Sequence, residues 1–466
     1  MPRRFVLLFL MLAMPTGILF AVLNPPGLVP DELSHATRVM GAAHGKFAGR
    51  RVWPAWSDHP LAGVIADDAF WKAVPGRSSK DKVDADTIDR QRSVQWSAAP
   101  KFLPISTIAV YSPIFYLPAA VAVRLAQFAG VIPFDAFVIG RMAALLVFVV
   151  MVVWALQVAR RGRALLFCTV SMPLTLMLAG SLNQDSLLIA SSVLAAALTT
   201  APTPRRRVVA AVLIGCIGAA KPPYLPLAIL LLLPLPLPGQ WRAMRPELLR
   251  RSAIGLVAVG LPLVWVSWML ATVSTPTHSL PYLAGPLWPG PAAQVFTGTD
   301  PQVQIQVLLK HPLRFLTLPL STLLRSTWPI NEAIGVLGAL DLLLPGWLYR
   351  VWMWAVPLAV LADACRREER VRATESILLI AAAILTIWAF YISQYLTWSE
   401  IGLNYIEGPT GRNFLPILPL IALAIPRLRV GGWPRIQALM STVPAIAVLC
   451  GLIALPSLLV STYYLR

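Results

Sequence analysis

Charged side chains are scarce in this chain, and long apolar runs take their place. Only 13% of its 466 residues are Asp, Glu, Lys or Arg, whereas 57% are hydrophobic. Soluble domains carry about 25% charged residues, so the composition excludes an ordinary water-soluble protein. Apolar runs of about 20 residues recur along the chain, and each is long enough to cross a bilayer core about 30 Å thick. Because lipid cannot satisfy backbone polar groups, these runs are predicted to be helices.

Other absences narrow the function classes. The four cysteines fall in or beside apolar runs, and no cysteine–histidine spacing is typical of a zinc site. There is no Walker A loop and no Gly-x-Ser-x-Gly elbow, so neither a soluble nucleotide donor nor a serine hydrolase is indicated. Acidic residues number only 21, against 39 Lys and Arg. The basic excess lies in short loops, as the positive-inside rule expects, and no nucleic-acid-binding module is present.

Six clusters of basic residues predict the topology. They are Arg3/Arg4, Arg160/Arg161/Arg163, Arg205–Arg207, Arg242/Arg245/Arg250/Arg251, Arg366/Arg367/Arg370/Arg372 and Arg427/Arg429/Arg435. If all of them face the cytoplasm, an even number of spans separates neighbouring clusters, and about eleven spans follow a cytoplasmic N-terminus. The spans are predicted at residues 5–23, 137–159, 164–181, 186–200, 208–220, 224–238, 252–272, 345–362, 376–396, 412–426 and 436–460.

Two longer regions then fall on the outer side, at residues 24–136 and 273–344. Residues 104–132 in the first region are apolar, but a full crossing there would place every later basic cluster outside. We expect them to form juxtamembrane or re-entrant helices, with a crossing as the open alternative. The predicted fold is all-α: one integrated polytopic helical membrane domain over residues 1–466, with both outer regions built onto it.

An unusual polar motif directly follows the first apolar run. It reads Pro30-Asp31-Glu32-Leu33-Ser34-His35-Ala36-Thr37-Arg38. If the segment is helical, Asp31, His35 and Arg38 fall on one face, at i, i+4 and i+7. Ionisable groups at the mouth of a membrane span indicate chemistry on a lipid-borne substrate. The structural alternative is an ordinary helix start, with proline in the first turn and acids against the helix dipole.

Further polar residues gather at the predicted outer ends of later spans. They are Asn183, Asp185, Lys221, Tyr224, Gln394, Glu400 and Arg412. Each also has a structural explanation: Asp185 could cap a helix, Lys221 could reach the interface from a helix end, and Arg412 could bind lipid phosphate. Ionisable residues at membrane depth are costly, so several of them on one side favour a functional site.

This set of residue types allows one particular chemistry. A carboxylate can take a proton from an attacking hydroxyl, and Lys or Arg can neutralise a phosphate leaving group as its charge develops. Asp31 and Asp185 could instead hold a divalent cation, Mg²⁺ or Mn²⁺, through oxygen ligands. Both arrangements fit the transfer of a sugar from a lipid phosphate.

An ordered series of short motifs gives the chain a family resemblance over most of its length. The motifs are Asn24-Pro25-Pro26 with Pro30-Asp31-Glu32, His35 and Arg38, then Tyr111-Ser112-Pro113-Ile114-Phe115-Tyr116-Leu117-Pro118, Gly140-Arg141, Asn183-Gln184-Asp185, Lys221-Pro222-Pro223-Tyr224, Phe390-Tyr391-Ile392-Ser393-Gln394-Tyr395 and Gly411-Arg412-Asn413-Phe414-Leu415-Pro416. The chain resembles an uncharacterised bacterial family of predicted polytopic membrane proteins, itself related to the C-type (GT-C) glycosyltransferases.

The resemblance implies a GT-C-like helical fold, a polyprenyl-phosphate sugar donor, and inversion at the anomeric carbon. The catalytic acid of the first external loop would be Asp31, with Glu32 as the competing candidate. Residues that would bind the donor phosphate are Lys221, Arg412, Tyr224 and Arg38. Residues that would support the site or bind the acceptor are His35, Asn183, Asp185, Gln394 and Glu400.

The sequence therefore predicts a glycosyltransferase of the bacterial inner membrane with an extracytoplasmic active site. It would pass a sugar from a polyprenyl-phosphate carrier to a hydroxyl of a cell-envelope glycan or of its lipid-linked precursor. The alternative is a transporter or flippase of a lipid-linked saccharide, whose polar residues should lie on discontinuous helices at mid-membrane depth. A non-catalytic scaffold of an envelope complex is a third hypothesis.

Overall fold

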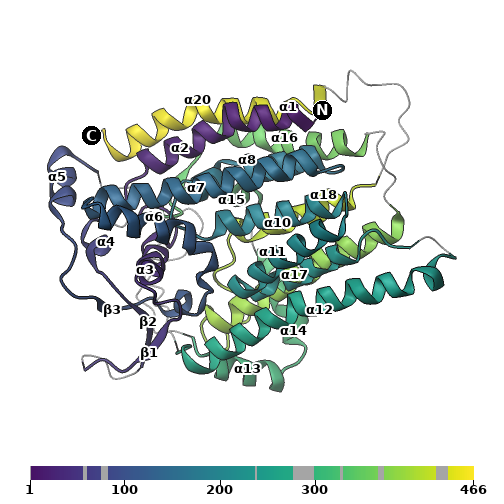
Figure 1. Ribbon diagram of the computed structural model, residues 1–466, viewed down its shortest axis with the longest axis horizontal. Coiled ribbons are helices and arrows are strands. Elements are labelled where there is room, and N and C mark those ends of the chain that lie inside the picture. Colours follow the sequence, from purple (N-terminus) through teal and green to yellow (C-terminus); the bar gives the residue numbers. More distant parts are fainter. Residues whose placement is uncertain are drawn as a thin grey trace.

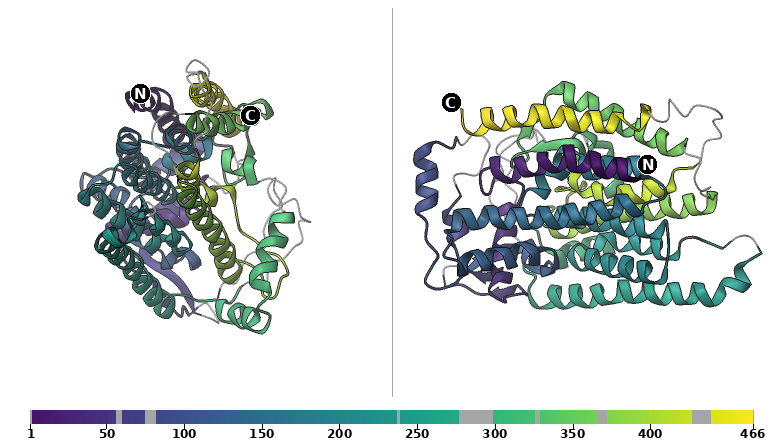
Figure 2. Two further views of the ribbon diagram at one scale, coloured as in Figure 1. Left: turned by 90° about the vertical axis from the view of Figure 1, so that its right-hand side faces the viewer. Right: turned by 45° about the horizontal axis from the view of Figure 1, so that its top comes forward.

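A computed structural model describes residues 2–55, 60–74, 82–236, 239–276, 299–325, 329–365, 372–426 and 439–465. The described chain is mostly helical, and its long helices lie roughly parallel to one another (Figures 1 and 2). The main core consists of aliphatic and aromatic side chains between these helices, which confirms a helical membrane protein as the general class.

The elements follow one another in a simple order. The N-terminal half contains α1 (Pro2–Leu8), the π-helical turn η1 (Phe9–Ala13), α2 (Met14–Leu23), α3 (Glu32–Ala43), β1 (Arg50–Val52), β2 (Leu61–Ala66), α4 (Ala69–Lys72), α5 (Ala85–Ser93), β3 (Lys101–Pro104), η2 (Ser106–Val110), η3 (Pro113–Tyr116), α6 (Leu117–Phe128), α7 (Pro133–Val158), α8 (Arg163–Ser171), α9 (Pro173–Ala179), α10 (Asp185–Thr199) and α11 (Pro204–Ala220). The C-terminal half contains η4 (Pro222–Leu232), α12 (Trp241–Thr272), α13 (Pro301–Lys310), α14 (Arg314–Arg325), α15 (Pro329–Gly335), β4 (Val336–Leu337), β5 (Leu342–Leu343), α16 (Gly346–Ala364), α17 (Ala373–Thr397), η5 (Gly411–Ile417), α18 (Leu418–Ala424) and α20 (Val443–Tyr463).

Five helical segments in the described residues are long and apolar enough to cross a membrane. They are Arg3–Leu23, Pro133–Val158, Trp241–Thr272, Ala373–Thr397 and Val443–Tyr463. Each overlaps a predicted span. The membrane-embedded character of the chain is therefore supported by length and composition together.

The remaining predicted spans are shorter or interrupted, so the number of crossings stays a prediction. Pro173 follows a break at Met172 and divides residues 164–181 into α8 and α9, because proline cannot donate the backbone hydrogen bond. Helix α10 has 15 residues, about 22 Å at 1.5 Å per residue, which is less than the bilayer core. Residues 222–232, with three prolines, form a 3₁₀ helix instead of an α-helix.

The expectation of an all-α chain was wrong in the first outer region. Strands β1, β2 and β3 form a small antiparallel sheet there, with Arg50 opposite Gly63 and Val64 opposite Leu103. The strands are only three to six residues long. Their side chains have no clear alternation of apolar and polar residues, which is the pattern that identifies strands in a sequence.

Residues 104–132 form η2, η3 and α6 beside the start of α7 (Figure 1). Helix α6 has 12 residues, about 18 Å, and the chain turns back at Gly130, which has a φ of 74°. The helical part, Pro113–Phe128, is shorter than the candidate spans, and whether it re-enters or crosses the membrane stays a prediction. In the second outer region, α13 and α14 pack on α17 through Leu308 and Leu318.

Side-chain contacts gather the described basic loops at one end of the bundle, which we call the basic end. Arg161 pairs with Glu375, Arg372 donates to the Leu235 carbonyl, and Arg207 pairs with Glu247. The N-terminus lies at this end and the C-terminus at the opposite one, near α5; the small sheet lies at that same end but away from the C-terminus (Figure 1). We call that opposite end the site end. In the basic cluster at 366–372 only Arg372 is described, and the cluster at 427–435 lies outside the described residues.

Candidate functional site

The two adjacent acids of the first motif point in opposite directions. Asp31 is the N-cap residue of α3 and has a φ of 60°, in the left-handed region that non-glycine residues rarely adopt. Its side chain forms no capping hydrogen bond with the helix. The simple helix-capping interpretation of Asp31 therefore does not hold. A strained residue at a helix start is typical of a functional site, because the surrounding fold must hold it in place.

Glu32 is fully buried and makes the contacts of a structural anchor. Its carboxylate accepts hydrogen bonds from Arg141 Nε at 2.8 Å and Arg141 Nη2 at 2.6 Å, and from the Leu182 and Gly27 amides. Arg141 also donates to the carbonyls of Ala21 and Asn24. All the strong acceptor positions of Glu32 are thus used. Its geometry does not favour the predicted alternative role as catalytic base.

Asp31 instead belongs to a cluster of four charged residues from four segments. Arg412 Nη2 lies 2.5 Å from Asp31 Oδ2, and Arg412 Nε lies 3.8 Å from Asp185 Oδ2. Lys221 Nζ lies 2.6 Å from Asp185 Oδ1. The charges therefore alternate along the line Asp31, Arg412, Asp185, Lys221. We call these residues the charge cluster; it brings together four residues that the sequence placed at separate span ends.

The charge cluster is open on the Asp31 side and closed on the other. The Asp31 side chain is 46% exposed, whereas Arg412 and Asp185 are 13% and 6% exposed. Within the described residues, Arg412 Nε has no hydrogen-bond partner despite its burial. The cluster therefore presents one accessible carboxylate and one unused guanidinium donor, which is the equipment needed to bind an anion beside a base.

The cluster also sets its own protonation state. Burial raises the pKa of Asp31, but the charge of Arg412 and its hydrogen bond outweigh that effect and hold the pKa below its usual value. The pKa of Arg412 is raised, because the two carboxylates outweigh the effect of burial. Both groups are therefore ionised at neutral pH, and Asp31 is ready to accept a proton.

His35 lies next to the cluster and is neutral. Its Nδ1 is 2.6 Å from the Tyr116 hydroxyl, and its ring stacks beside Tyr111 at 6.5 Å. Burial lowers the pKa of His35 to about 4, although Asp185 and Asp31 oppose that shift. A neutral imidazole can pass or position a proton without adding a third cation to the cluster.

Several of the predicted phosphate-binding and supporting residues instead make structural hydrogen bonds to backbone groups. Arg38 is buried and donates to the carbonyls of Phe47 and Tyr111. Tyr224 is also buried, and its hydroxyl donates to the Asn413 carbonyl at 2.8 Å, next to Arg412. The structure thus gives Arg38 and Tyr224 positioning contacts, and neither shows a hydrogen bond to the charge cluster among the described residues.

Asn183 joins two parts of the cluster. Its Nδ2 donates to the Pro30 carbonyl at 2.9 Å, and its Oδ1 accepts from the Asp185 amide at 2.9 Å. This side chain therefore fixes the turn that carries Asp31 against the start of α10. Gln394 and Glu400 lie at the end of α17, where the Gln304 side chain of α13 donates to the Glu400 carbonyl. Their contacts associate them with α13 and the neighbouring loop.

Glu332 is a site residue that the sequence interpretation missed. Its Oε2 accepts from the Gly411 amide at 2.8 Å, so α15 holds the segment that carries Arg412. A Cβ atom at Gly411 would lie 2.1 Å from the Ala333 amide nitrogen, so only glycine fits there. Burial raises the pKa of Glu332 to about 7. In the sequence, Glu332 is a single acid between apolar segments. An isolated ionisable residue of this kind in a membrane protein is a candidate functional residue.

The expected divalent cation does not fit the residues present. The described part of the chain has no group of three or more His, Cys, Asp or Glu side chains that could hold a metal ion. Asp31 and Asp185 are each already paired with a cationic side chain, so the cluster is neutral without a metal. A divalent ion usually binds more oxygen ligands than two separated carboxylates supply.

The comparison with protein families agrees with the membrane fold. Residues 14–421 match the family model described as predicted membrane protein (DUF2142). The chain belongs to this family. The match spans all four residues of the charge cluster, from Asp31 to Arg412, and the family's function is unknown. No curated protein and no solved structure matches this DUF2142 chain.

Proposed function

We propose that this DUF2142 protein is a glycosyltransferase related to the C-type (GT-C) enzymes. It would act in a bacterial inner membrane, take a sugar from a polyprenyl-phosphate donor, and transfer it to a hydroxyl of a cell-envelope glycan or lipid-linked precursor. The observation that carries the proposal is the charge cluster, in which Asp31, Arg412, Asp185 and Lys221 converge from four distant segments.

The position of the cluster supports an extracytoplasmic active site. The described basic loops lie at the basic end. Asp185 begins α10 and Lys221 follows α11, at the helix ends that lie away from these loops. Positively charged loops are retained in the cytoplasm, so the site end would face away from it. A polyprenyl phosphate holds its headgroup at the membrane surface, within reach of a cluster at the ends of the helices.

The proposed reaction balances in charge and protons. The acceptor oxygen forms a bond to the anomeric carbon while the bond from that carbon to the phosphate oxygen breaks. The acceptor proton passes to Asp31, and the leaving polyprenyl phosphate gains one negative charge. Arg412 and Lys221 neutralise that charge, which grows only as the bond breaks and is therefore stabilised mainly in the transition state.

The ion pair between Asp31 and Arg412 would control the basicity of the Asp31 carboxylate. In the free protein, Arg412 holds Asp31 ionised and lowers its affinity for a proton. A bound phosphate competes for the same guanidinium and would weaken its contact with Asp31. The carboxylate then becomes a stronger base only when the donor is present.

The decisive experiment compares Asp31→Asn with Asp89→Asn. Asp89 is an exposed acid of α5 outside the charge cluster, so it is the matched control. Purified proteins in lipid nanodiscs receive a panel of polyprenyl-phosphate sugars and hydroxyl acceptors, and products are measured by mass spectrometry. Transfer by the wild type and Asp89→Asn, but not by Asp31→Asn, supports the proposal. Equal activity of all three excludes Asp31 as the base.

The same panel separates the enzyme from the flippase hypothesis. A flippase moves the intact lipid-linked saccharide across the bilayer and leaves the glycosidic bond unbroken. Movement of a labelled donor between leaflets, without any new glycoside and with Asp31→Asn still active, would overturn the transferase proposal.

A further inference from the structure

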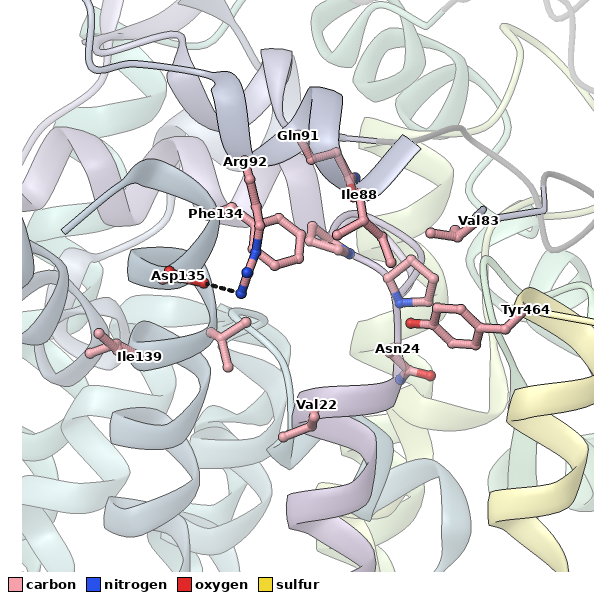
Figure 3. Close-up of a pocket in the computed structure, with 13 residues that line it drawn as sticks. Val22, Asn24, Val83, Ile88, Gln91, Arg92, Phe134, Asp135, Ile139 and Tyr464 are labelled. Carbon is pink, nitrogen blue, oxygen red and sulfur yellow. Dashed lines mark hydrogen bonds and ion pairs between the residues drawn. The ribbon is translucent and has the colours of Figure 1, made fainter. Parts of the chain in front are cut away.

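A cavity of about 360 Å³ lies apart from the charge cluster, where α5 meets the ends of α2 and α20 and the start of α7. Figure 3 shows its lining, whose polar residues are Asn24, Gln91, Arg92, Asp135 and Tyr464. The Gln91 side chain already donates to the Ala73 carbonyl at 2.7 Å. The remaining walls of the cavity are largely apolar, including Val22, Ile88, Phe134, Val138 and Ile139. Neither the proposed reaction nor the anchoring of Glu32 uses this cavity.

An unsatisfied polar side chain belongs to a residue in the wall of the cavity. Asn24 is 1% exposed, and neither its side-chain nitrogen nor its side-chain oxygen has a hydrogen-bond partner within the described residues. Burying an amide without partners costs free energy of about 1–3 kcal/mol. Because neither amide atom has accessible surface, a ligand in the cavity would reach this amide only if the side chain turned toward it.

Two opposite charges stand at the rim of the cavity. Arg92 Nη2 lies 3.3 Å from Asp135 Oδ1, and the two side chains are 55% and 41% exposed. Such an exposed pair with a single contact is weak, of about 0.2–1 kcal/mol, so a ligand can separate it at small cost. A ligand that carries both a phosphate and an ammonium group would satisfy both residues at once.

The cavity also lies where a lipid headgroup would be expected. It is built on the ends of two candidate membrane spans, Arg3–Leu23 and Pro133–Val158. From Ile139 at the cavity, exposed apolar side chains continue down one face of α7 at Met142, Leu146 and Val150. These positions recur at helical spacing and offer a track for an acyl chain.

We propose that this cavity binds a phospholipid with a phosphoethanolamine headgroup. The phosphate pairs with Arg92, the primary ammonium donates to Asp135, and an acyl chain follows the exposed apolar face of α7. A phosphatidylglycerol has no cation for Asp135. A phosphatidylcholine has a cation that cannot donate a hydrogen bond. The observed charges therefore select the ethanolamine headgroup.

The bound lipid would brace the segment that leads to Asp31. The carbonyls of Asn24 and Pro25 accept hydrogen bonds from Arg141, which in turn holds Glu32. An occupant of the cavity packs against the other side of this segment. Lipid binding is thus expected to raise the unfolding temperature of the protein, whether or not the charge cluster transfers a sugar.

The test measures lipid binding to the delipidated full chain by native mass spectrometry. Phosphatidylethanolamine, phosphatidylcholine and phosphatidylglycerol with identical acyl chains are compared with soluble glycerophosphoethanolamine. Phosphatidylethanolamine should bind about tenfold more tightly than each other compound, as expected for one charge-assisted hydrogen bond. Equal binding of phosphatidylglycerol would overturn the headgroup assignment, and equal binding of the soluble compound would overturn the lipid source.

Variants of the rim locate the binding. Arg92→Gln and Asp135→Asn should each weaken phosphatidylethanolamine binding about tenfold and remove its effect on the unfolding temperature. Arg90→Gln is the matched control, because Arg90 lies on the same helix but does not line the cavity. If Arg92→Gln fails to fold, the exchange of Arg92→Asp with Asp135→Arg keeps an ion pair and should still lose the lipid. Binding equal to that of Arg90→Gln in these variants refutes the proposal.

Discussion

Two ion pairs start from neighbouring residues and have opposite properties. The Glu32–Arg141 pair is fully buried, and five hydrogen bonds of Arg141 enclose it. The Asp31–Arg412 pair is partly open, and Arg412 keeps a donor that no described residue uses. The first arrangement fixes a backbone segment, and the second leaves polar groups available to a ligand. An ion pair whose hydrogen-bonding groups are all used indicates a structural role. An ion pair that keeps an unused donor indicates a binding or catalytic role.

The largest expected effect comes from breaking the buried Glu32–Arg141 pair. Glu32→Gln leaves the Arg141 guanidinium buried without its anion, which costs about 3–5 kcal/mol of stability. We expect low yield and a strongly reduced unfolding temperature, measured by differential scanning fluorimetry in detergent. Asp31→Asn, one residue away, should change stability by less than about 1 kcal/mol because its side chain is half exposed. Equal destabilisation by the two variants would contradict the distinction.

The second prediction concerns activity. Asp31→Asn removes the proposed proton acceptor while its amide can still accept a hydrogen bond from Arg412. We expect kcat for sugar transfer to fall by about 10²–10⁴-fold with little change in KM for the donor, as is usual for a lost general base. Single-turnover assays with a radiolabelled donor measure this effect. A change in donor KM alone would make Asp31 a binding residue instead.

The contrast between these two acids also marks the limit of sequence reasoning. Composition and basic loops predicted a helical membrane protein, and the predicted site residues included the four that form the charge cluster. Asp31 and Glu32 could not be separated, because both are acids and their divergence depends on the left-handed backbone at Asp31. The partner of Glu32 lies 109 positions away, and only packing of α7 on α2 brings Arg141 there.

The third prediction concerns Arg412, the cationic partner of Asp31. Arg412→Lys keeps the charge but loses the planar fork that lies between Asp31 and Asp185. We expect KM for the polyprenyl-phosphate donor to rise roughly tenfold, the equivalent of one charge-assisted hydrogen bond, with smaller loss of kcat. Steady-state kinetics over a range of donor concentrations separate the two parameters. Arg325→Lys, on the exposed side of α14, serves as the control.

Glu332 lies between the two extremes, because it is partly buried and, among the described residues, a backbone amide is the donor to its carboxylate. Its pKa in the folded protein, about 7, lies above that of an ordinary glutamate at 4.5. The folded state therefore holds a proton that the unfolded state has released, so stability should fall as pH rises through the interval between these values. Glu332→Gln keeps an acceptor for the Gly411 amide and should remove this pH-dependent loss, an effect of order 1 kcal/mol.

Unfolding temperatures of the wild type and Glu332→Gln at pH 5 and pH 8 check this expectation. The difference between the proteins should appear only at pH 8, where the wild type carries a partly buried charge. Destabilisation of Glu332→Gln at both values would mean that the ionised carboxylate strengthens its bond to Gly411. Glu332 would then be a structural residue like Glu32. The position of the segment that carries Arg412 would depend on the negative charge of Glu332.

The smallest effect is expected at Glu400, which the sequence analysis assigned to the site from its place at a predicted span end. Its carbonyl accepts from Gln304, and this backbone contact survives any change of the side chain. Glu400→Gln should therefore change kcat and both KM values by less than about twofold, within the range of ordinary surface substitutions. A tenfold loss of acceptor affinity in the same assay would show that the acceptor extends from the charge cluster as far as α13. The substrate-binding region would then extend beyond Asp31. The number of unused hydrogen-bonding groups on a side chain would no longer distinguish site residues from structural ones.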